Sequence, residues 1–290
     1  MKILITGLKS YVGKQLEKRI KELNKNWSVD FISLREDSWR NKSFQEYDVI
    51  YHVASIVHKK EKEKDKEIYY SVNRDLTYQL ASKAREEGVQ SFIFLSTLAV
   101  YGLIGEIDKD IIIDNHTQLK PNTYYGESKL EAEELLLSLQ TVNFKTCIVR
   151  APMIYGPSSP GNYSSLRKLA LLTPIFPEIS NSRSMIFIDN LSDIVICIIE
   201  NRISGVKLVG NSYNASTSII VKEIREAKNK KTILSPKLGL LIIRFGKRSD
   251  LLKKIFGNLT YQKDATFKLS NSSNEIGLVS SIKKTEGATK

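Results

Sequence analysis

The chain has 290 residues, a mass of 32.9 kDa and a formal net charge of +12 at pH 7. With 41% hydrophobic and 26% charged residues it has an ordinary globular composition, and it is long enough for one elaborated domain or for two lobes. Its longest strongly apolar run near the C-terminus, 238–245, is too short to span a bilayer, and the N-terminus lacks the apolar segment of a signal peptide. We therefore expect a cytoplasmic protein.

The positive charge calls for an anionic partner, and nucleic acid, a membrane surface and nucleotide ligands all qualify. No basic motif with interleaved aromatic residues is present, so we expect no nucleic acid partner. Residues 222–254 hold eleven Lys and Arg against three acidic residues. This segment could face acidic lipid, with 238–245 as its apolar partner. Solvated lysines on helices are the favoured interpretation, however, and we expect no membrane contact.

Short apolar runs predict five β-strands, at residues 2–6, 29–34, 48–53, 91–96 and 145–150. Segments with helical spacing separate them, notably at residues 14–25, 69–87 and 125–139. Strands and helices that alternate in this way predict a parallel sheet covered on both faces. Ligands of such sheets bind beyond the carboxyl ends of the strands, which is where Gly7, Leu34, Ala54 and Thr97 fall.

After Arg150 the alternation loosens, and five prolines punctuate the next thirty or so residues. We expect an α/β fold with a Rossmann-type, doubly wound parallel sheet at residues 1–150 and a smaller C-terminal substrate-binding lobe at residues 151–290. The two are expected to interleave.

Cysteine and histidine give no sign of a metal. Cys147 and Cys197 are flanked by apolar residues, which favours buried thiols over a disulfide or a metal site. The three histidines, His52, His58 and His116, have no metal-ligand spacing. We predict no metal.

The first expected strand leads into a turn, from Gly7 to Gly13, and then into a helix. Such a turn aims the first N–H groups of the helix at a pyrophosphate, with the positive end of the helix dipole behind them. Gly7 would permit the turn, and Gly13 would permit close packing of helix on strand. Ser10 stands where the usual fingerprint has Gly. Ser is small enough to admit a phosphate, but an ordinary strand-to-helix turn stays an alternative.

Tyr125 and Lys129 are one turn apart on the helix expected at 125–139, so their side chains share a face. A cation beside a phenol favours the anion and lowers the phenol's pKa, which suits acid and base catalysis. A Tyr and a Lys at this spacing also occur by chance in a chain of this composition. Tyr124 is a weaker candidate, because residue 128 is Ser and supplies no cation.

Six motifs occur in a recognisable order, at residues 7–13, 48–54, 73, 94–102, 125–129 and 150–157. With this order and spacing the chain resembles the extended short-chain dehydrogenase/reductase family over nearly its whole length. Residues 183–190 and 255–259 also look like the subgroup of sugar-nucleotide enzymes in bacterial capsule and O-antigen synthesis.

The resemblance implies a catalytic set of Thr97, Tyr125 and Lys129. Tyr125 would donate a proton to a carbonyl being reduced, or accept one from an alcohol being oxidised. Lys129 would lower the pKa of Tyr125 and hold the nicotinamide ribose, and Thr97 would bind the same substrate oxygen as Tyr125. Alternatively, Thr97 simply ends a strand. Asn73 matches a family Asn near the site, with a structural hydrogen-bonding role as its alternative.

The resemblance also implies a nicotinamide dinucleotide. The implied contacts are Gly7, Ser10, Tyr11, Val12, Gly13, Arg35, Asp48, Val49, Ala54, Tyr125, Lys129 and Pro152. Asp48 and Val49 would contact the adenine. Ser33 stands where an acidic residue would bind a ribose 2′-hydroxyl, and Arg35 lies nearby for a 2′-phosphate, whereas Asp30 faces the wrong part of the strand. NADP(H) is therefore favoured, with NAD(H) as the alternative.

The subgroup implies a UDP-sugar substrate and reduction of the C4 ketone of a UDP-2-acetamido-2,6-dideoxy-hexos-4-ulose. A 4-epimerase of UDP-glucose or UDP-GlcNAc type is the alternative. A non-catalytic NADP-binding sensor is a second one, although such proteins usually lose the Tyr or the Lys. Thr97, Asn162 and Arg183 are the implied substrate contacts, the last two at the diphosphate, unless Arg183 is a surface residue. A homodimer, common in the family, is also open.

Overall fold

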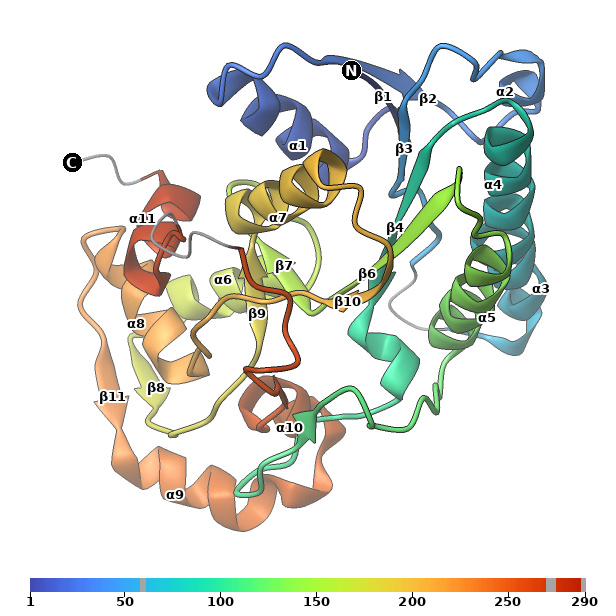
Figure 1. Cartoon of the computed structure of the whole chain (residues 1–290). Coiled ribbons are helices and arrows are strands. Elements are labelled where there is room, and N and C mark those ends of the chain that lie inside the picture. The colour runs from blue at the N-terminus through green and yellow to red at the C-terminus, as the bar shows by residue number, and fades with distance from the viewer. Residues whose placement is uncertain (58–60, 270–274, 288–290) are drawn as a thin grey trace. The chain divides into compact units, whose positions relative to one another are not determined.

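The computed structural model describes residues 1–57, 61–269 and 275–287 (Figure 1). The chain folds as two compact units. The first comprises Met1–Gly102, Gln118–Ala151 and Ser192–Leu208, and the second comprises Leu103–Thr117, Pro152–Leu191 and Val209–Lys290. Each unit thus draws on several separate stretches of the chain. The functional division expected between residues 1–150 and 151–290 stays a prediction.

A six-stranded parallel sheet with the order β10-β6-β4-β3-β1-β2 forms the first unit. The strands are β1 (Lys2–Thr6), β2 (Ser28–Ile32), β3 (Val49–His52), β4 (Ser91–Thr97), β6 (Lys145–Ala151) and β10 (Gly205–Leu208). The α/β fold expected from the sequence is confirmed, with β10 as an additional strand. Because β2 lies on one side of β1 and all later strands on the other, the winding direction changes between β1 and β3. Such sheets bind their ligands at this switch point, beyond the carboxyl ends of the strands.

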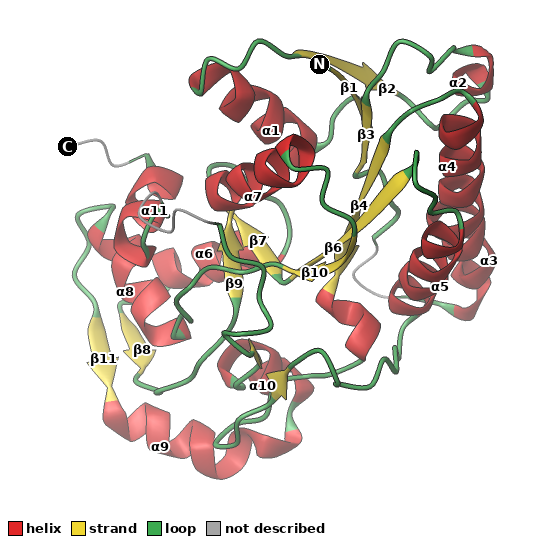
Figure 2. Ribbon diagram, in the orientation of Figure 1, coloured by secondary structure: helices red, strands yellow, loops and turns green. Residues whose placement is uncertain are grey.

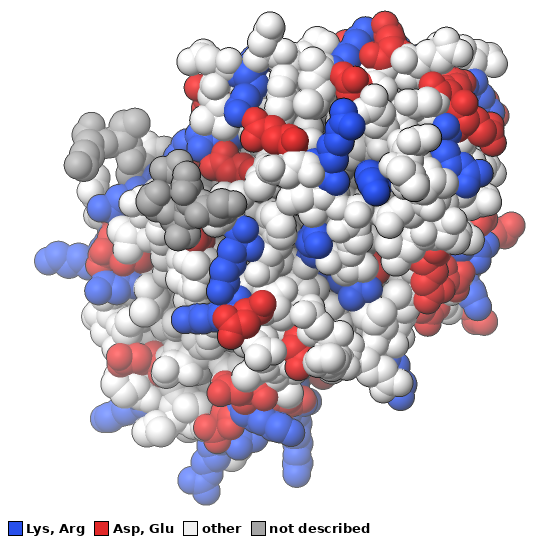
Figure 3. All heavy atoms as spheres, viewed as in Figure 1, with Lys and Arg blue, Asp and Glu red and all other residues white. Residues whose placement is uncertain are grey.

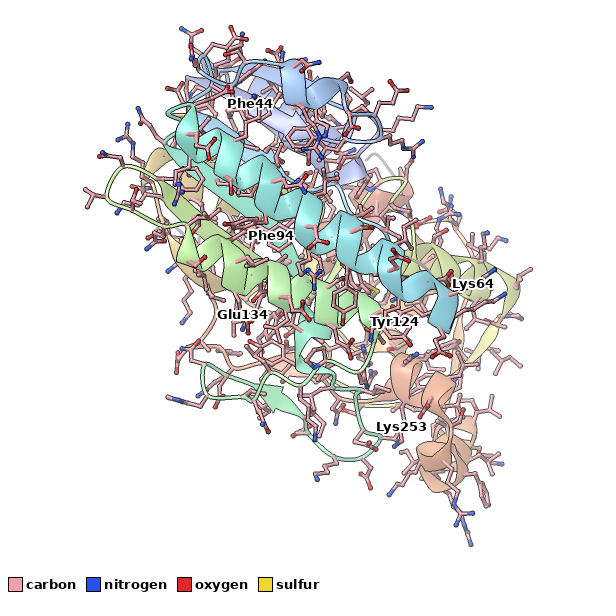
Figure 4. All side chains as sticks on the ribbon, turned by 90° about the vertical axis from the view of Figure 1, so that its right-hand side faces the viewer. Phe44, Lys64, Phe94, Tyr124, Glu134 and Lys253 are labelled. Carbon is pink, nitrogen blue, oxygen red and sulfur yellow. The ribbon has the colours of Figure 1, made fainter. Side chains whose placement is uncertain are left out.

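The apolar runs of the strands are continuous because helices cover both faces of the sheet. On one face, Leu4, Ile50 and Phe92 are fully buried in a core shared with α4 (Leu76–Glu86) and α5 (Tyr124–Ser138). Figure 4 shows α4 and α5 side by side, with Phe94 between them. These two helices hold the side chains discussed below in fixed positions over the sheet.

The opposite face carries α1 (Tyr11–Glu22) and the part of α7 (Ile188–Glu200) that belongs to the first unit. The Arg19 guanidinium joins them through two hydrogen bonds to Asp193, of 2.7 and 2.8 Å. Helix α1 corresponds to the helix expected at 14–25, but it begins earlier, directly after its cap at Ser10, and it ends at Glu22.

Shorter helical segments complete the first unit: α2 (Ser38–Asn41), η1 (Glu63–Asp65), α3 (Lys66–Tyr69), η2 (Tyr70–Asp75) and η3 (Leu98–Tyr101). The single helix expected at 69–87 consists of the end of α3, a π-helical turn (η2) and α4. Such turns insert one extra residue and occur often beside functional sites.

Short parallel strand pairs and helices build the second unit (Figure 2). The pairs are β7 (Met153–Tyr155) with β9 (Met185–Phe187), β8 (Ile175–Pro177) with β11 (Ile233–Ser235), and β5 (Ile112–Ile113) with β12 (Thr260–Tyr261). The helices are α6 (Asn162–Leu172), α8 (Thr217–Glu226), α9 (Pro236–Phe245), η4 (Gly246–Arg248), α10 (Asp250–Phe256) and α11 (Leu278–Glu286). Tyr155 lies at its core, with ring centroids 5.4 Å from Tyr163 and 5.5 Å from Phe187, and its hydroxyl 2.7 Å from that of Ser281.

Candidate active site

The turn between β1 and α1 has the geometry expected for a phosphate. Gly7 has a φ of 88°, which side chains disfavour. A Cβ on Gly13 would lie 2.7 Å from Cγ2 of Ile5, so α1 could not approach β1 this closely with a larger residue. The Oγ of Ser10 caps α1 by accepting a 3.1 Å hydrogen bond from the amide of Gly13. The first turn of α1 holds no acidic residue that would oppose a bound anion.

A buried hydrogen-bond chain ties the carboxyl ends of β1 and β3 together. The Thr6 hydroxyl accepts from the amides of Val53 and Ala54 at 3.0 Å each and lies 2.9 Å from Nδ1 of His52. Nε2 of His52 lies 2.8 Å from the Thr77 hydroxyl, which donates its own proton to a backbone carbonyl. Nε2 therefore carries the ring proton. Burial, helped by the nearby ammonium on α5, lowers the pKa of His52 to about 3, so this ring is neutral and structural.

Asn73, in η2, connects the loop after β3 to helix α5. Its side chain accepts from the amide of Ile56 at 2.8 Å and donates to the carbonyl of Ile56 at 3.1 Å and to the Ser128 hydroxyl at 3.2 Å. The Ser128 hydroxyl in turn donates to the carbonyl of Tyr125 at 3.0 Å. Asn73 thus has a structural hydrogen-bonding role: it holds the loop after β3 against helix α5, and both border the site.

Tyr125 and Thr97 meet at the carboxyl edge of the sheet. Tyr125 lies in the first turn of α5 and Thr97 ends β4, and the phenol hydrogen-bonds with the hydroxyls of both Thr97 and Ser55. Ser55 follows β3 directly after Ala54. Ser55 was not among the site residues expected from the sequence, although a hydroxyl just beyond a strand expected to end at the ligand edge was a usable signal. Three hydroxyls therefore converge from two strand ends and one helix.

The pKa of Tyr125 shifts in the direction opposite to the one expected. Burial raises the pKa of the phenol to about 12, and the hydrogen bonds with Thr97 and Ser55 oppose that rise. Lys129 is not among the groups that shift the pKa of Tyr125; its Nζ lies over the ring of Phe94, 3.8 Å from the centroid. The expectation that Lys129 lowers the phenol's pKa is thus corrected for this structure, in which Tyr125 is protonated at neutral pH.

Lys129 is itself strongly perturbed. It is 1% exposed, and burial lowers the pKa of its ammonium to about 7 against the opposing attraction of Glu133. Glu133, one turn further along α5, is also buried and accepts hydrogen bonds of 2.6 and 3.0 Å from the guanidinium of Arg150. The Ser96 hydroxyl donates to the same carboxylate. Arg150 further donates to the Tyr101 hydroxyl at 3.0 Å. Successive turns of α5 thus place a phenol, an amine and a carboxylate along the sheet.

Lys129→Met should change how stability depends on pH. In the folded chain the ammonium loses its proton near pH 7, whereas in the unfolded chain it does so near pH 10.5, so the unfolded state binds more protons between these values. The wild-type free energy of unfolding should therefore rise with pH, relative to Lys129→Met, by about 1 kcal/mol per unit between about pH 7.5 and 8.5. Urea unfolding across this range measures the slope. The exposed Lys168→Met is the control, and equal slopes for wild type and Lys129→Met would contradict the burial argument.

Glu61 holds the N-terminus of α5 in place. Its carboxylate accepts hydrogen bonds from the amides of Tyr124 at 2.7 Å and Tyr125 at 3.0 Å. Thr123 caps the same turn, since its Oγ1 accepts from the amide of Gly126 at 3.0 Å. A carboxylate at this end also complements the helix dipole. Because Glu61 is more than sixty residues away in sequence, no local motif indicated that it fixes the turn that carries Tyr125.

Asp48 and Val49 do not lie at the ligand edge. Asp48 precedes β3, and its carboxylate accepts a 2.7 Å hydrogen bond from the amide of Lys2, at the start of β1. Val49 is buried and pairs with Ile3. The starts of parallel strands lie at the edge opposite to their carboxyl ends. The expected adenine contacts of Asp48 and Val49 are therefore corrected: their place at the amino end of β3 keeps them from a ligand at the carboxyl edge.

Arg35 is the residue that was expected to favour NADP(H) over NAD(H) by binding the 2′-phosphate. It follows β2 and is exposed, and its guanidinium forms no ion pair within the described ranges 1–57, 61–269 and 275–287. The end of β2 lies beside the phosphate turn, since the amide of Gly7 donates to the carbonyl of Ile32 at 2.7 Å. Asp30 accepts a 2.8 Å hydrogen bond from the Tyr47 hydroxyl in mid-strand and so faces elsewhere, as expected.

The other expected ligand contacts belong to the second unit. Arg183 is half-buried, and its Nη1 donates to the carbonyl of Gly257, at the C-terminal end of α10, at 2.8 Å. No carboxylate of the described chain pairs with this guanidinium, and burial lowers its pKa. Asn162 is exposed at the start of α6, and Pro152 is buried just after β6 in the chain. The roles expected for these three residues stay predictions.

Within the part of the chain that the structure describes, no group of three or more His, Cys, Asp or Glu could hold a metal ion. His58 lies outside the described residues. Cys147 is buried, Cys197 is partly buried, and both are free thiols. A search of the same residues finds no helix with both the length and the apolar character needed to cross a membrane.

Comparison with known proteins gives the family. Residues 3–215 match the model of the NAD dependent epimerase/dehydratase family. UDP-glucose 4-epimerase of Vibrio cholerae is 32% identical over 228 residues, which cover 73% of this chain and 67% of that protein. N-acetyl-alpha-D-glucosaminyl-diphospho-ditrans,octacis-undecaprenol 4-epimerase of Escherichia coli O157:H7 is 25% identical over 277 residues, which cover 88% of this chain and 81% of that protein. UDP-2-acetamido-2,6-beta-L-arabino-hexul-4-ose reductase of Pseudomonas aeruginosa is 27% identical over 251 residues, which cover 82% of this chain and 61% of that protein.

Solved structures agree on the fold. The protein RMD of Pseudomonas aeruginosa, complexed with NADPH, superposes with a TM-score of 0.76 at 17% identity, over 99% of both chains. UDP-glucuronic acid 4-epimerase of Bacillus cereus, in complex with NAD, gives 0.72 at 22% identity, over 99% of this chain and 96% of that one. At these identities the likeness shows a shared fold.

Proposed function

Because the chain belongs to the NAD dependent epimerase/dehydratase family, whose members are NAD(P)-dependent enzymes, we propose that it reduces the C4 ketone of a UDP-2-acetamido-2,6-dideoxy-hexos-4-ulose. One observation carries the proposal: the convergence of the Tyr125, Thr97 and Ser55 hydroxyls at the carboxyl edge of the sheet, beyond the switch point beside the Gly7 turn. A ketone oxygen placed among these hydroxyls would meet one proton donor and two further hydrogen-bonding groups.

The protonation state of Tyr125 suits the reductive direction. A phenol whose pKa is raised to about 12 keeps its proton at neutral pH, so it is ready to give that proton to a ketone oxygen as negative charge develops there. Thr97 and Ser55 would orient the phenol and share the charge. The nicotinamide, when bound, supplies the hydride. Lys129, one turn away, would hold the ribose hydroxyls, and its own pKa of about 7 leaves both of its protonation states populated near neutral pH.

The residues of the first unit fit a nicotinamide dinucleotide. The left-handed Gly7, the close approach at Gly13 and the capped start of α1 form a cradle for the pyrophosphate, with the amides of Tyr11 and Val12 at the first turn. Ala54 borders this turn, since a Cβ on Gly7 would lie 3.6 Å from its Cβ. These five residues and Ser10 are the proposed pyrophosphate site, and Pro152 stays a proposed contact of the dinucleotide.

Arg35→Ser should reverse the cofactor preference. The exposed Arg35 guanidinium at the end of β2, which pairs with no carboxylate of the described residues, can form charge-assisted hydrogen bonds with a 2′-phosphate, which NADPH has and NADH lacks. The dissociation constant for NADPH should rise by about 10- to 100-fold, and that for NADH should change little. Titration of nicotinamide fluorescence measures both, with the exposed Arg85→Ser as the control. Equal weakening of both nucleotides would show that Arg35 does not read the 2′ position.

In the second unit, Arg183 is the proposed anchor for the diphosphate of the substrate. Its guanidinium is bound to backbone carbonyls of α10 and the residue that follows, and it lacks a carboxylate partner among the described residues. An Arg held in this way keeps its charge available for phosphate oxygens, which its planar fork matches better than an ammonium would. Asn162 is the proposed second contact.

A 4-epimerase is the second candidate function. The observation that favours it is the 32% identity to a UDP-glucose 4-epimerase, above the 27% to a 4-reductase. The relative with an undecaprenol diphosphate sugar in its name raises the further alternative of a lipid-linked substrate. An epimerase needs Tyr125 to take a proton as well as to give one, so it requires the bound cofactor to lower a pKa that is high in the structure.

A direct assay separates these candidates. Purified protein is mixed with the UDP-4-keto sugar and either NADPH or NADH, and the reduced-nicotinamide absorbance is followed. Stoichiometric loss of NADPH supports the reductase. Interconversion of UDP-glucose and UDP-galactose, or of their N-acetyl forms, without net change of cofactor would replace it with the epimerase.

A further inference from the structure

Several large apolar side chains in the second unit remain exposed to solvent. On α9, Leu238, Leu240, Leu241 and Phe245 are large hydrophobic residues that stay exposed, and Leu240 and Phe245 are more than 60% accessible. Leu251, in the neighbouring α10, is equally exposed. Single exposed hydrophobic residues are ordinary, but four on ten residues of helix, with a fifth nearby, form a patch that calls for an apolar environment.

The fold holds this face outward. Ser235 caps α9 by accepting from the amide of Leu238 at 3.4 Å, and Pro236 occupies its first turn. A Cβ on Gly239 would lie 2.0 Å from the carbonyl oxygen of Glu178, so the backbone of α9 rests directly on the chain after β8. This edge is buried, and the helix cannot roll its leucines inward without losing that contact.

Basic residues outnumber acidic ones beside the patch. The sequence has no Asp or Glu between residues 227 and 249, and Asp250 is the only one between 227 and 256. Lys253 pairs with Glu106 at 2.8 Å and Lys247 lies 3.4 Å from Asp108. Lys237, Arg244, Arg248 and Lys254 have no carboxylate partner within the described ranges of the chain. Figure 3 shows Lys and Arg projecting from the end of this unit where Figure 1 places α9, with some Asp and Glu beside them.

Cations and apolar residues alternate around the same helix face. Lys237 lies one turn before Leu241, and Leu240 lies one turn before Arg244, which in turn lies over the Phe245 ring at 5.5 Å. A purely apolar partner would bury these cations without compensation. A layer of phosphate headgroups over acyl chains accepts both kinds of side chain, because long cationic side chains can extend to the phosphates while leucines enter the hydrocarbon.

We propose that α9, together with Leu251 and Lys254 of α10, docks the protein on an anionic phospholipid bilayer, with the helix lying in the plane of the membrane surface. Ten residues of helix are too few to span a bilayer, so the attachment is peripheral and reversible. The sequence alone favoured solvated lysines for this segment. The exposure of Leu240, Leu241 and Phe245 in the folded chain is the observation that changes the balance.

Vesicle sedimentation tests the proposal and does not depend on the reaction catalysed. The full chain should pellet with vesicles that contain about 30% phosphatidylglycerol in about 0.1 M salt, and much less with pure phosphatidylcholine. Raising the salt to about 0.5 M should weaken the binding, because the cations are screened. Wild-type protein that does not sediment with the anionic vesicles would overturn the proposal.

Two sets of variants separate the contributions. The triple variant Leu240→Ser, Leu241→Ser, Phe245→Ser should lower vesicle partitioning by at least about tenfold, whereas Val142→Ser, at an exposed valine of the first unit, should not change it. Lys237→Gln with Arg244→Gln should weaken binding to anionic vesicles only. If the triple variant fails to fold, Phe245→Trp provides the second test: its fluorescence should shift to the blue with anionic vesicles, and no shift would overturn the proposal. A dimer that the triple variant dissociates, without vesicle binding by wild type, would assign the face to a second copy instead.

Discussion

Tyr125→Phe should lower turnover by about 100- to 10,000-fold while leaving dinucleotide affinity within a factor of about three. The change removes one oxygen and keeps the ring, so the half-buried site retains its packing, and the hydroxyls of Thr97 and Ser55 stay where they are. What is lost is the proton that the raised phenol pKa keeps in place at neutral pH. Steady-state kinetics give the turnover, and nicotinamide fluorescence gives the affinity.

Tyr124→Phe is the matched control for this prediction. Tyr124 is the preceding residue of the same helix turn, its ring lies 5.8 Å from the Lys66 ammonium, and Figure 4 shows it at the start of α5. This variant should keep turnover within a factor of about three of wild type. If Tyr125→Phe kept more than a tenth of wild-type turnover, the proton donor would have to be another group, and the Ser55 and Thr97 hydroxyls would be the next to test.

Glu133→Ala should lower the free energy of unfolding by about 3–5 kcal/mol. The Glu133 carboxylate is 1% exposed and is bound by Arg150, itself 8% exposed, with further hydrogen bonding from Ser96. Removing it takes away the carboxylate that pairs with the buried guanidinium, and a hydrogen bond to the neutral Tyr101 hydroxyl does not replace a counter-charge. The midpoint and slope of urea unfolding measure the loss.

Glu134→Ala provides the comparison, because Glu134 is the next residue on α5 and is exposed (Figure 4). It should change stability by no more than about 0.5 kcal/mol. The double variant Glu133→Leu with Arg150→Met should recover most of the loss, since it replaces a buried ion pair with apolar groups of similar size. Equal effects of Glu133→Ala and Glu134→Ala would show that the ion pair contributes little.

Local pattern was enough to predict the first unit's architecture. Apolar runs alternating with helical segments predicted five of the six strands, and the close packing expected at Gly13 is confirmed, since a Cβ there would lie 2.7 Å from Cγ2 of Ile5. Strand β10 was not predicted, because Gly205–Leu208 is short and only partly buried. Asp48 was misplaced for an avoidable reason: a residue that precedes a parallel strand lies at the amino edge, whatever family motif it belongs to.

The electrostatics of the site could not be predicted from spacing. A separation of four residues correctly placed Tyr125 and Lys129 on one helix, but it carried no information on burial, which determines both pKa values. The contacts of Glu61 with Tyr125, and of Glu133 with Arg150, join residues that are distant in sequence. The exposure of the leucines of α9 could not be predicted either, because it depends on which face of this helix the rest of the second unit covers.

Deuterium transfer tests whether the protein reduces the C4 ketone with Tyr125 as the proton donor. The protein is incubated with the UDP-4-keto sugar and NADPH that carries deuterium at its transferable position, and the product is analysed by mass spectrometry and NMR. We expect a C4 alcohol with deuterium on carbon, formed by wild type and almost not at all by Tyr125→Phe. A product without deuterium at C4, or the same labelled product from both proteins, would contradict this expectation.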